Sequence, residues 1–152
     1  MRDLERRIAE LTDDEAMYAA VYLANWMGAQ AKELGRLPSG EAIPDEQEAL
    51  DILGQALPEL ADQLIEISAA EKRGQVARNI LSFLTRDHAS KVEEALNRPR
   101  VMEPFTASLG ASILLLLLLE FDLEYTDKKS GKTLKISKKT SILEFLMALL
   151  GH

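Results

Sequence analysis

The chain has 152 residues, 47% of them hydrophobic and 28% charged, which is typical of one globular domain able to bury its own core. It contains no cysteine, so disulfides, thiolate catalysis and cysteine-based zinc sites are excluded. The net charge is −7, yet residues 128–139 hold six lysines and no acid, whereas residues 1–70 hold 15 acids and 5 bases. This balance makes nucleic-acid binding unlikely outside the lysine-rich segment.

The N-terminal sequence MRDLERRIAE is charged and has no apolar stretch of the kind that a secretory signal needs. We therefore expect a cytoplasmic protein. Thr12 and Glu15 have the spacing of a capping box, which predicts a helix start. This helix should run to about Leu34 and end at Gly35.

The predicted helix is apolar on nearly all sides, because Asn25 is the only strongly polar residue between positions 16 and 27. Such a helix is buried in a core or against another chain. Tyr18, Tyr22 and Trp26 recur every four residues and therefore form one stripe. Tyrosine and tryptophan are common interface anchors, so this stripe is a candidate surface for self-association or for a protein partner.

The segment RLPSGEAIP, residues 36–44, is a predicted loop. We expect one domain over residues 1–152, in which residues 1–35 could form a helical arm joined by this loop. A helix should follow from Asp45 and break at Pro58, which also suits the first turn of the next helix.

Two further helices are expected before the leucine-rich segment. Val76, Ile80 and Leu84 mark the apolar face of the first, and Asp87 is a predicted cap for a second, shorter helix. The prolines that follow, at 99 and 104, predict a turn.

Residues 104–119 carry no charge and end in six consecutive leucines, which raises the possibility of a membrane segment. A spanning helix needs roughly 20 apolar residues, and Glu103 and Glu120 bound this stretch too closely. We therefore interpret it as a buried central helix. Insertion into a membrane remains the alternative.

Alternating apolar and polar residues from Leu119 to Thr126, and again in KTLKISK, predict an antiparallel hairpin around the turn DKKSG. No helix breaker lies between Ser112 and Asp127, so the point at which the helix ends and the strand begins stays open. Its polar faces should place lysines opposite carboxylates. A final helix should begin at Thr140 or Ser141, and Glu144 would complete a capping box with Ser141. The lysines form a candidate patch for an anion or an acidic partner: Lys128, Lys129, Lys132, Lys135, Lys138 and Lys139.

Catalytic patterns are weak. Gly131-Lys132-Thr133 resembles the end of a phosphate-binding loop, but Thr126 stands where that motif requires glycine, and a strand is predicted where it requires a helix. Asp87 and His88 are sequence neighbours whose side chains point apart on a helix. The sequence predicts no catalytic residue, metal site or cofactor.

The sequence thus predicts a mainly α fold of six or seven helices with one C-terminal β-hairpin packed on them, or an α+β fold if the hairpin joins a larger sheet. The leading functional hypothesis is a non-catalytic cytoplasmic interaction or adaptor module that self-associates through the aromatic helix. The alternatives are a membrane-associated protein that uses residues 104–119 and the lysine hairpin, and a hydrolase with an unrecognised site.

Overall fold

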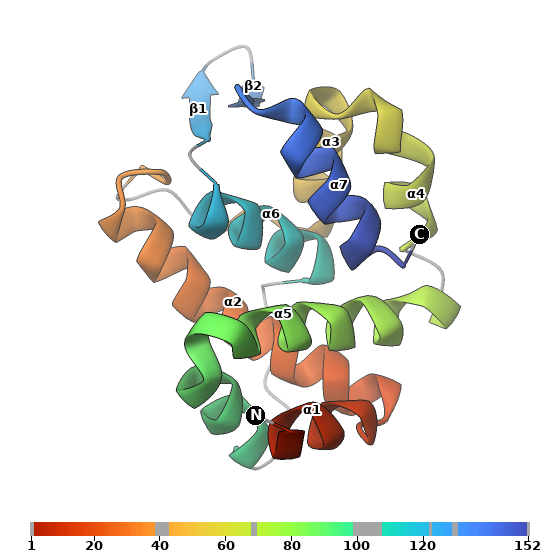
Figure 1. The fold of residues 1–152 in the computed structure, drawn as a ribbon. Coiled ribbons are helices and arrows are strands. Elements are labelled where there is room, and N and C mark those ends of the chain that lie inside the picture. Colours follow the sequence, from red (N-terminus) through yellow and green to blue (C-terminus); the bar gives the residue numbers. More distant parts are fainter. Residues whose placement is uncertain are drawn as a thin grey trace.

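The structure is a computed structural model that describes residues 2–38, 43–67, 70–98, 108–121, 123–128 and 131–151. These ranges contain seven α-helices, one 3₁₀ turn and a two-stranded antiparallel hairpin (Figure 1). The helices are α1 (Arg2–Ala9), α2 (Asp13–Glu33), α3 (Glu46–Ala56), α4 (Ala61–Glu66), α5 (Ala70–Asn97), α6 (Leu109–Glu120) and α7 (Lys139–Leu149). The 3₁₀ turn η1 is Pro58–Leu60, and the strands are β1 (Glu124–Lys128) and β2 (Gly131–Lys135). The predicted mainly α fold with a C-terminal hairpin is confirmed.

The leucine-rich helix α6 is the centre of the core. All ten residues from Leu109 to Leu118 are buried, so this part of the helix is covered around its whole circumference. Helix α2 packs on α6 and α5 through small side chains, among them Ala20 and Ala24. The hydroxyl of Ser112 donates to the carbonyl of Ser108 at 2.9 Å, which satisfies this polar group inside the core.

The predicted start and end of α2 are confirmed. The Thr12 hydroxyl accepts from the Glu15 amide at 3.2 Å, and the Glu15 carboxylate accepts from the Thr12 amide at 3.0 Å. Gly35 follows the helix with a φ of 74°, a conformation that favours glycine. The predicted break at Pro58 is also confirmed, because Pro58 opens η1 directly before α4.

Helix α5 joins the two helices expected around Asp87. It is assigned as one element, but His88 has φ −134° and ψ 40°, which are not helical values, so the helix kinks there. The expected boundary between the two helices is therefore present as a kink at His88, and Asp87 does not begin a separate helix.

The hairpin pairs Glu124 with Lys135 and Asp127 with Lys132, which confirms the predicted register of acids opposite lysines. Tyr125 and Leu134 are buried, and β2 packs against α3, so the hairpin lies on the helical core. In Figure 1 it lies at the opposite end of the molecule from α1.

The boundary between the leucine-rich helix and the first strand, which the sequence left open, follows Glu120, and Leu119 is a helical residue partly buried against the core. One predicted feature near this hairpin is wrong, because the capping box at Ser141 and Glu144 does not form. Helix α7 begins at Lys139, two residues before Ser141, and its N-cap Lys138 makes no side-chain capping bond. The prolines at 99 and 104 lie outside the described residues.

Candidate functional site

The strongest candidate for a functional surface is a groove between α3 and α4. Asp45 starts α3, because its carboxylate accepts a hydrogen bond from the Glu48 amide at 2.9 Å. After α3, Pro58 begins the 3₁₀ turn η1, and α4 follows directly after this turn. The cavity between the two helices has a volume of about 420 Å³. It is lined by Gln47, Leu50, Asp51, Gly54, Gln55, Ala61, Leu64 and Ile65.

The groove has an unusual apolar wall. Ile65 is 68% exposed, the most exposed of the large apolar side chains in the described residues. Leu64 beside it is buried, and Leu50 across the groove is half-buried. Leu50, Leu64 and Ile65 together form an apolar seam that reaches the surface at Ile65. Gly54 contributes open space, since a Cβ added there would meet no atom within 4 Å.

The surroundings of the groove are acidic. Residues 43–67 hold seven acids and no base. Three of these acids are in ion pairs with cations from other parts of the chain: Glu46 with Arg73 at 2.9 Å, Glu66 with Lys72 at 3.9 Å, and Glu59 with Lys139 at 3.0 Å. Asp51, in the groove wall, instead accepts a hydrogen bond from the side-chain amide of Gln47 at 2.9 Å.

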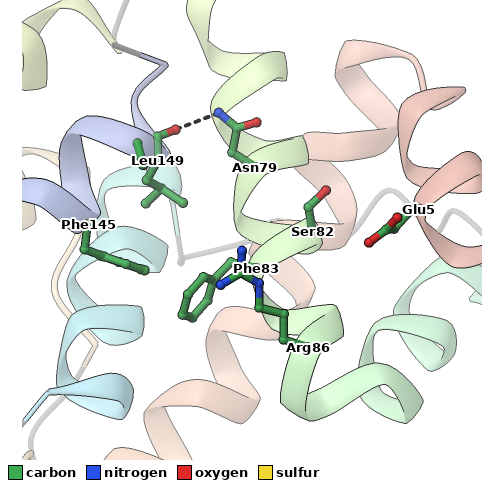
Figure 2. A pocket seen from close by; sticks show the side chains of 8 residues that line it. Glu5, Asn79, Ser82, Phe83, Arg86, Phe145 and Leu149 are labelled. Carbon is green, nitrogen blue, oxygen red and sulfur yellow. Dashed lines mark hydrogen bonds between the residues drawn. The ribbon is translucent and has the colours of Figure 1, made fainter. Parts of the chain in front are cut away.

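A second cavity of about 320 Å³ lies between α1, α5 and α7 (Figure 2). Phe83 and Phe145 form its apolar side in an edge-to-face pair with ring centroids 4.7 Å apart. Figure 2 shows the Arg86 side chain lying across Phe83, and its guanidinium carbon is 5.6 Å from the ring centroid. Asn79 is engaged in donating to the Leu149 carbonyl at 2.7 Å. Because its polar groups are exposed or already bonded, this cavity has no feature that selects a ligand.

A polar cluster at the C-terminal end of α6 was missed by the sequence reasoning. His88 at the α5 kink lies 3.8 Å from the Glu120 carboxylate, and its ring meets Trp26 edge-to-face at 4.8 Å. Arg36 donates to the carbonyls of Leu118 and Leu119 at 3.0 Å each, which satisfies the free end of α6. No local pattern links these residues, because they come from separate parts of the chain.

Burial raises the pKa of Glu120 above its ordinary value, and the nearby Asp87 carboxylate raises it further. His88 and Arg36 act in the opposite direction through their charges. A histidine beside a carboxylate is a common acid–base pair, but here Trp26 covers the ring and Arg36 serves as a helix cap. Within the described residues, no group of three or more acidic or histidine side chains could hold a metal ion.

The predicted aromatic stripe has partners inside the chain. The Tyr22 hydroxyl donates to the Glu94 carboxylate at 3.1 Å, and the guanidinium carbon of Arg98 lies 4.3 Å from the Tyr22 ring centroid. The Tyr22 hydrogen bond is the main cause of a lowered pKa of Glu94. Trp26 contacts His88, and Tyr18 is half-buried on the same helix. Tyr22 and Trp26 therefore lie against the second half of α5.

The predicted lysine patch is only partly described. Lys135, Lys138 and Lys139 are exposed, and Lys139 pairs with Glu59. This hydrogen-bonded contact is the main cause of a lowered pKa of Glu59. The side chains of Lys128, Lys129 and Lys132 lie outside the described residues.

None of the helices in the described ranges has the length and apolar character to cross a bilayer. Helix α6 has 12 residues, or about 18 Å, against the ~30 Å of a hydrocarbon core. No family model, curated protein or solved structure matches this chain.

Proposed function

We propose that this protein is a non-catalytic interaction module whose contact surface is the groove between α3 and α4. The observation that carries the proposal is the exposed Ile65 beside a cavity of about 420 Å³. A large apolar side chain at the edge of a concave surface typically marks a contact site for another molecule. Burial of Ile65 by a partner would remove its apolar surface from water and so stabilise the complex.

The titratable groups support a non-catalytic role. The His88–Glu120 pair is the closest approach to an acid–base site in the described chain, and its neighbours Trp26 and Arg36 serve packing and helix capping. Neither of the two cavities described above places a histidine beside a nucleophile. For the third hypothesis, a hydrolase, the described residues offer no such pair in either cavity to argue from.

The contacts of Tyr22 and Trp26 also bear on where another molecule would bind. Self-association through the faces of Tyr22 and Trp26 that now pack on α5 would require the second half of α5 to move away, which would break the Tyr22–Glu94 hydrogen bond and the Trp26–His88 contact. The groove needs no such rearrangement, because Ile65 is exposed already. For this reason the proposed contact surface is the groove.

Site-specific photo-cross-linking in cells of the source organism tests this proposal. A benzoylphenylalanine placed at position 65 should give one discrete adduct, and Gly54→Leu in the same chain should abolish it by filling the groove. The control places the same group at Met147, which is 44% exposed on α7. Absence of an adduct at position 65, or equal adducts at both positions, would contradict the proposal.

A further inference from the structure

We infer that the occupant of the α3–α4 groove is a basic amphipathic helix supplied by another protein. The inference rests on the proposed function and adds the chemistry of the partner. Two observations carry it: the apolar seam that ends at Ile65, and the acidic segment around it. Helices that bind in grooves present an apolar face with anchors three and four residues apart, and their polar face meets the rim.

The shape of the site suits a short helix. Helix α3 has 11 residues and is therefore about 16 Å long, which matches about three turns of a bound helix. The apolar lining comes from both helices, Leu50 on α3 and Leu64 and Ile65 on α4. A helix lying between them would place its apolar face against this lining and its polar face toward solvent and the rim.

The acidic residues around the groove favour a partner helix whose polar face carries lysines or arginines. The seven acids of residues 43–67 have no base among them, and the ion pairs with Lys72, Arg73 and Lys139 engage three of these acids. Asp51 lies in the groove wall itself, hydrogen-bonded to a neutral amide, and Asp62 is exposed on α4. Lysines or arginines flanking the apolar anchors would meet these carboxylates, which favours both partner choice and the rate of encounter.

The same charges argue against a second copy of the chain as the occupant. In a two-fold contact whose axis passes through the groove, the two grooves would face each other, so Asp51 would lie near the Asp51 of the other copy. Like charges placed together in an interface are costly. The whole chain also carries a net charge of −7, which opposes close approach of two copies.

A peptide panel tests the inference. Three labelled 14-residue helical peptides share one leucine stripe and differ only in their polar face, which is lysine, glutamine or glutamate. Binding to the full chain is followed by fluorescence anisotropy at low and high salt. We expect the lysine peptide to bind at least tenfold more tightly than the glutamine peptide, with the advantage lost at high salt, and the glutamate peptide not to bind.

Variants locate the binding. Ile65→Gln should weaken the lysine peptide about tenfold, and Gly54→Leu should abolish binding of both the lysine and the glutamine peptide. Asp51→Asn should weaken only the lysine peptide, by several-fold. The matched controls are Met147→Gln for loss of an exposed apolar side chain and Glu33→Gln for loss of an exposed acid, and neither should change affinity.

The outcomes separate this inference from the proposed function. Equal binding of the lysine and glutamine peptides that still depends on Ile65 would overturn the basic partner and leave the groove as a contact surface. Binding of the lysine peptide that Ile65→Gln and Gly54→Leu leave unchanged would be non-specific attraction and would also overturn the inference. A dimer that dissociates on Ile65→Gln would identify a second copy as the occupant. Failure of all peptides together with failure of the cross-link would overturn both proposals.

Discussion

Replacement of a glycine by alanine at two helical positions, Gly54 and Gly74, tests the packing of the fold. Gly54 lies in α3 beside the groove, where an added Cβ meets nothing within 4 Å. Gly74 lies buried in α5, where an added Cβ would overlap the carboxylate of Asp13 and come within 2.7 Å of its Cβ. Alanine at either position gains about 0.5–1 kcal/mol of helix propensity. The two variants therefore differ only in the space that the fold leaves for the added methyl group.

Gly54→Ala should stabilise the protein by that gain, which raises Tm by about 1–4 °C for a chain of this size. Gly74→Ala should destabilise it. Overpacking costs about 1–3 kcal/mol, and the movement of Asp13 weakens its 2.7 Å contact with Arg78. That contact is largely exposed on the Asp13 side and contributes less than about 1 kcal/mol. The net expectation is a loss of about 1–2 kcal/mol.

Urea denaturation followed by circular dichroism at 222 nm measures both variants, with the slope of the transition as a check on two-state unfolding. A Gly74→Ala protein as stable as the parent would show that α2 does not approach α5 at Asp13, and would refute the packing. The background Asp13→Gly supplies the internal control. Without the Asp13 side chain, Gly74→Ala should become stabilising by about 0.5–1 kcal/mol.

Three other predictions concern the core and the polar contacts. Leu115→Ala should cost about 3–4 kcal/mol by urea denaturation, whereas Leu34→Ala should cost less than about 1 kcal/mol, because Leu115 is fully buried in α6 and Leu34 is 53% exposed; equal losses would contradict the central position of α6. Glu120 has a raised pKa when folded, so its contribution to stability is complete below the pKa of the unfolded chain and is lost as pH rises through the folded pKa. Glu120→Gln should therefore be more stable than the parent at pH 7 by thermal melts and equal to it near pH 3, and a difference at pH 3 as large as at pH 7 would refute this account. Tyr22→Phe should raise the pKa of Glu94 toward its ordinary value, as measured by NMR titration, because the Tyr22 hydroxyl is the main group that lowers it; an unchanged titration would show that this hydrogen bond is absent.

The elements that the sequence predicts well have local causes. The capping box at Thr12 and Glu15 satisfies helix amides with side chains three residues apart, and Pro58 cannot continue a helix from the residue before it. The mainly α fold follows from such signals together with helical periodicity. Ser141 has an equally good local pattern, but α7 begins two residues before it and makes contacts with distant parts of the chain. Lys139 pairs with Glu59, and Asn79 binds the Leu149 carbonyl.

The candidate sites depend on distant contacts and were less predictable. The acidic character of residues 43–67 can be read from the sequence, but Leu64 and Ile65 have the same apolar character, and only the packing of α4 buries one and exposes the other. The cluster of Trp26, His88 and Glu120 joins three helices that no local periodicity relates. The aromatic stripe was predicted as an interface from its spacing. Tyr22 and Trp26 contact the second half of α5, while all three side chains keep part of their surface exposed, so the interface stays a prediction.

The position of the groove relative to the core allows docking and folding to be separated. Helix α3 packs on α6, and its Ala49 and Leu53 side chains are buried in the core, whereas Asp51 and Gly54 line the groove. Leu50 belongs to both, because it lines the groove and lies against Gly110 of α6. Removal of a side chain such as Leu53 would therefore disturb the core, whereas Ile65→Gln and Gly54→Leu change only exposed or open positions. We expect these two substitutions to leave the core intact, so that a loss of binding can be assigned to the groove itself. Unfolding transitions that match the parent protein would establish that assignment for each variant.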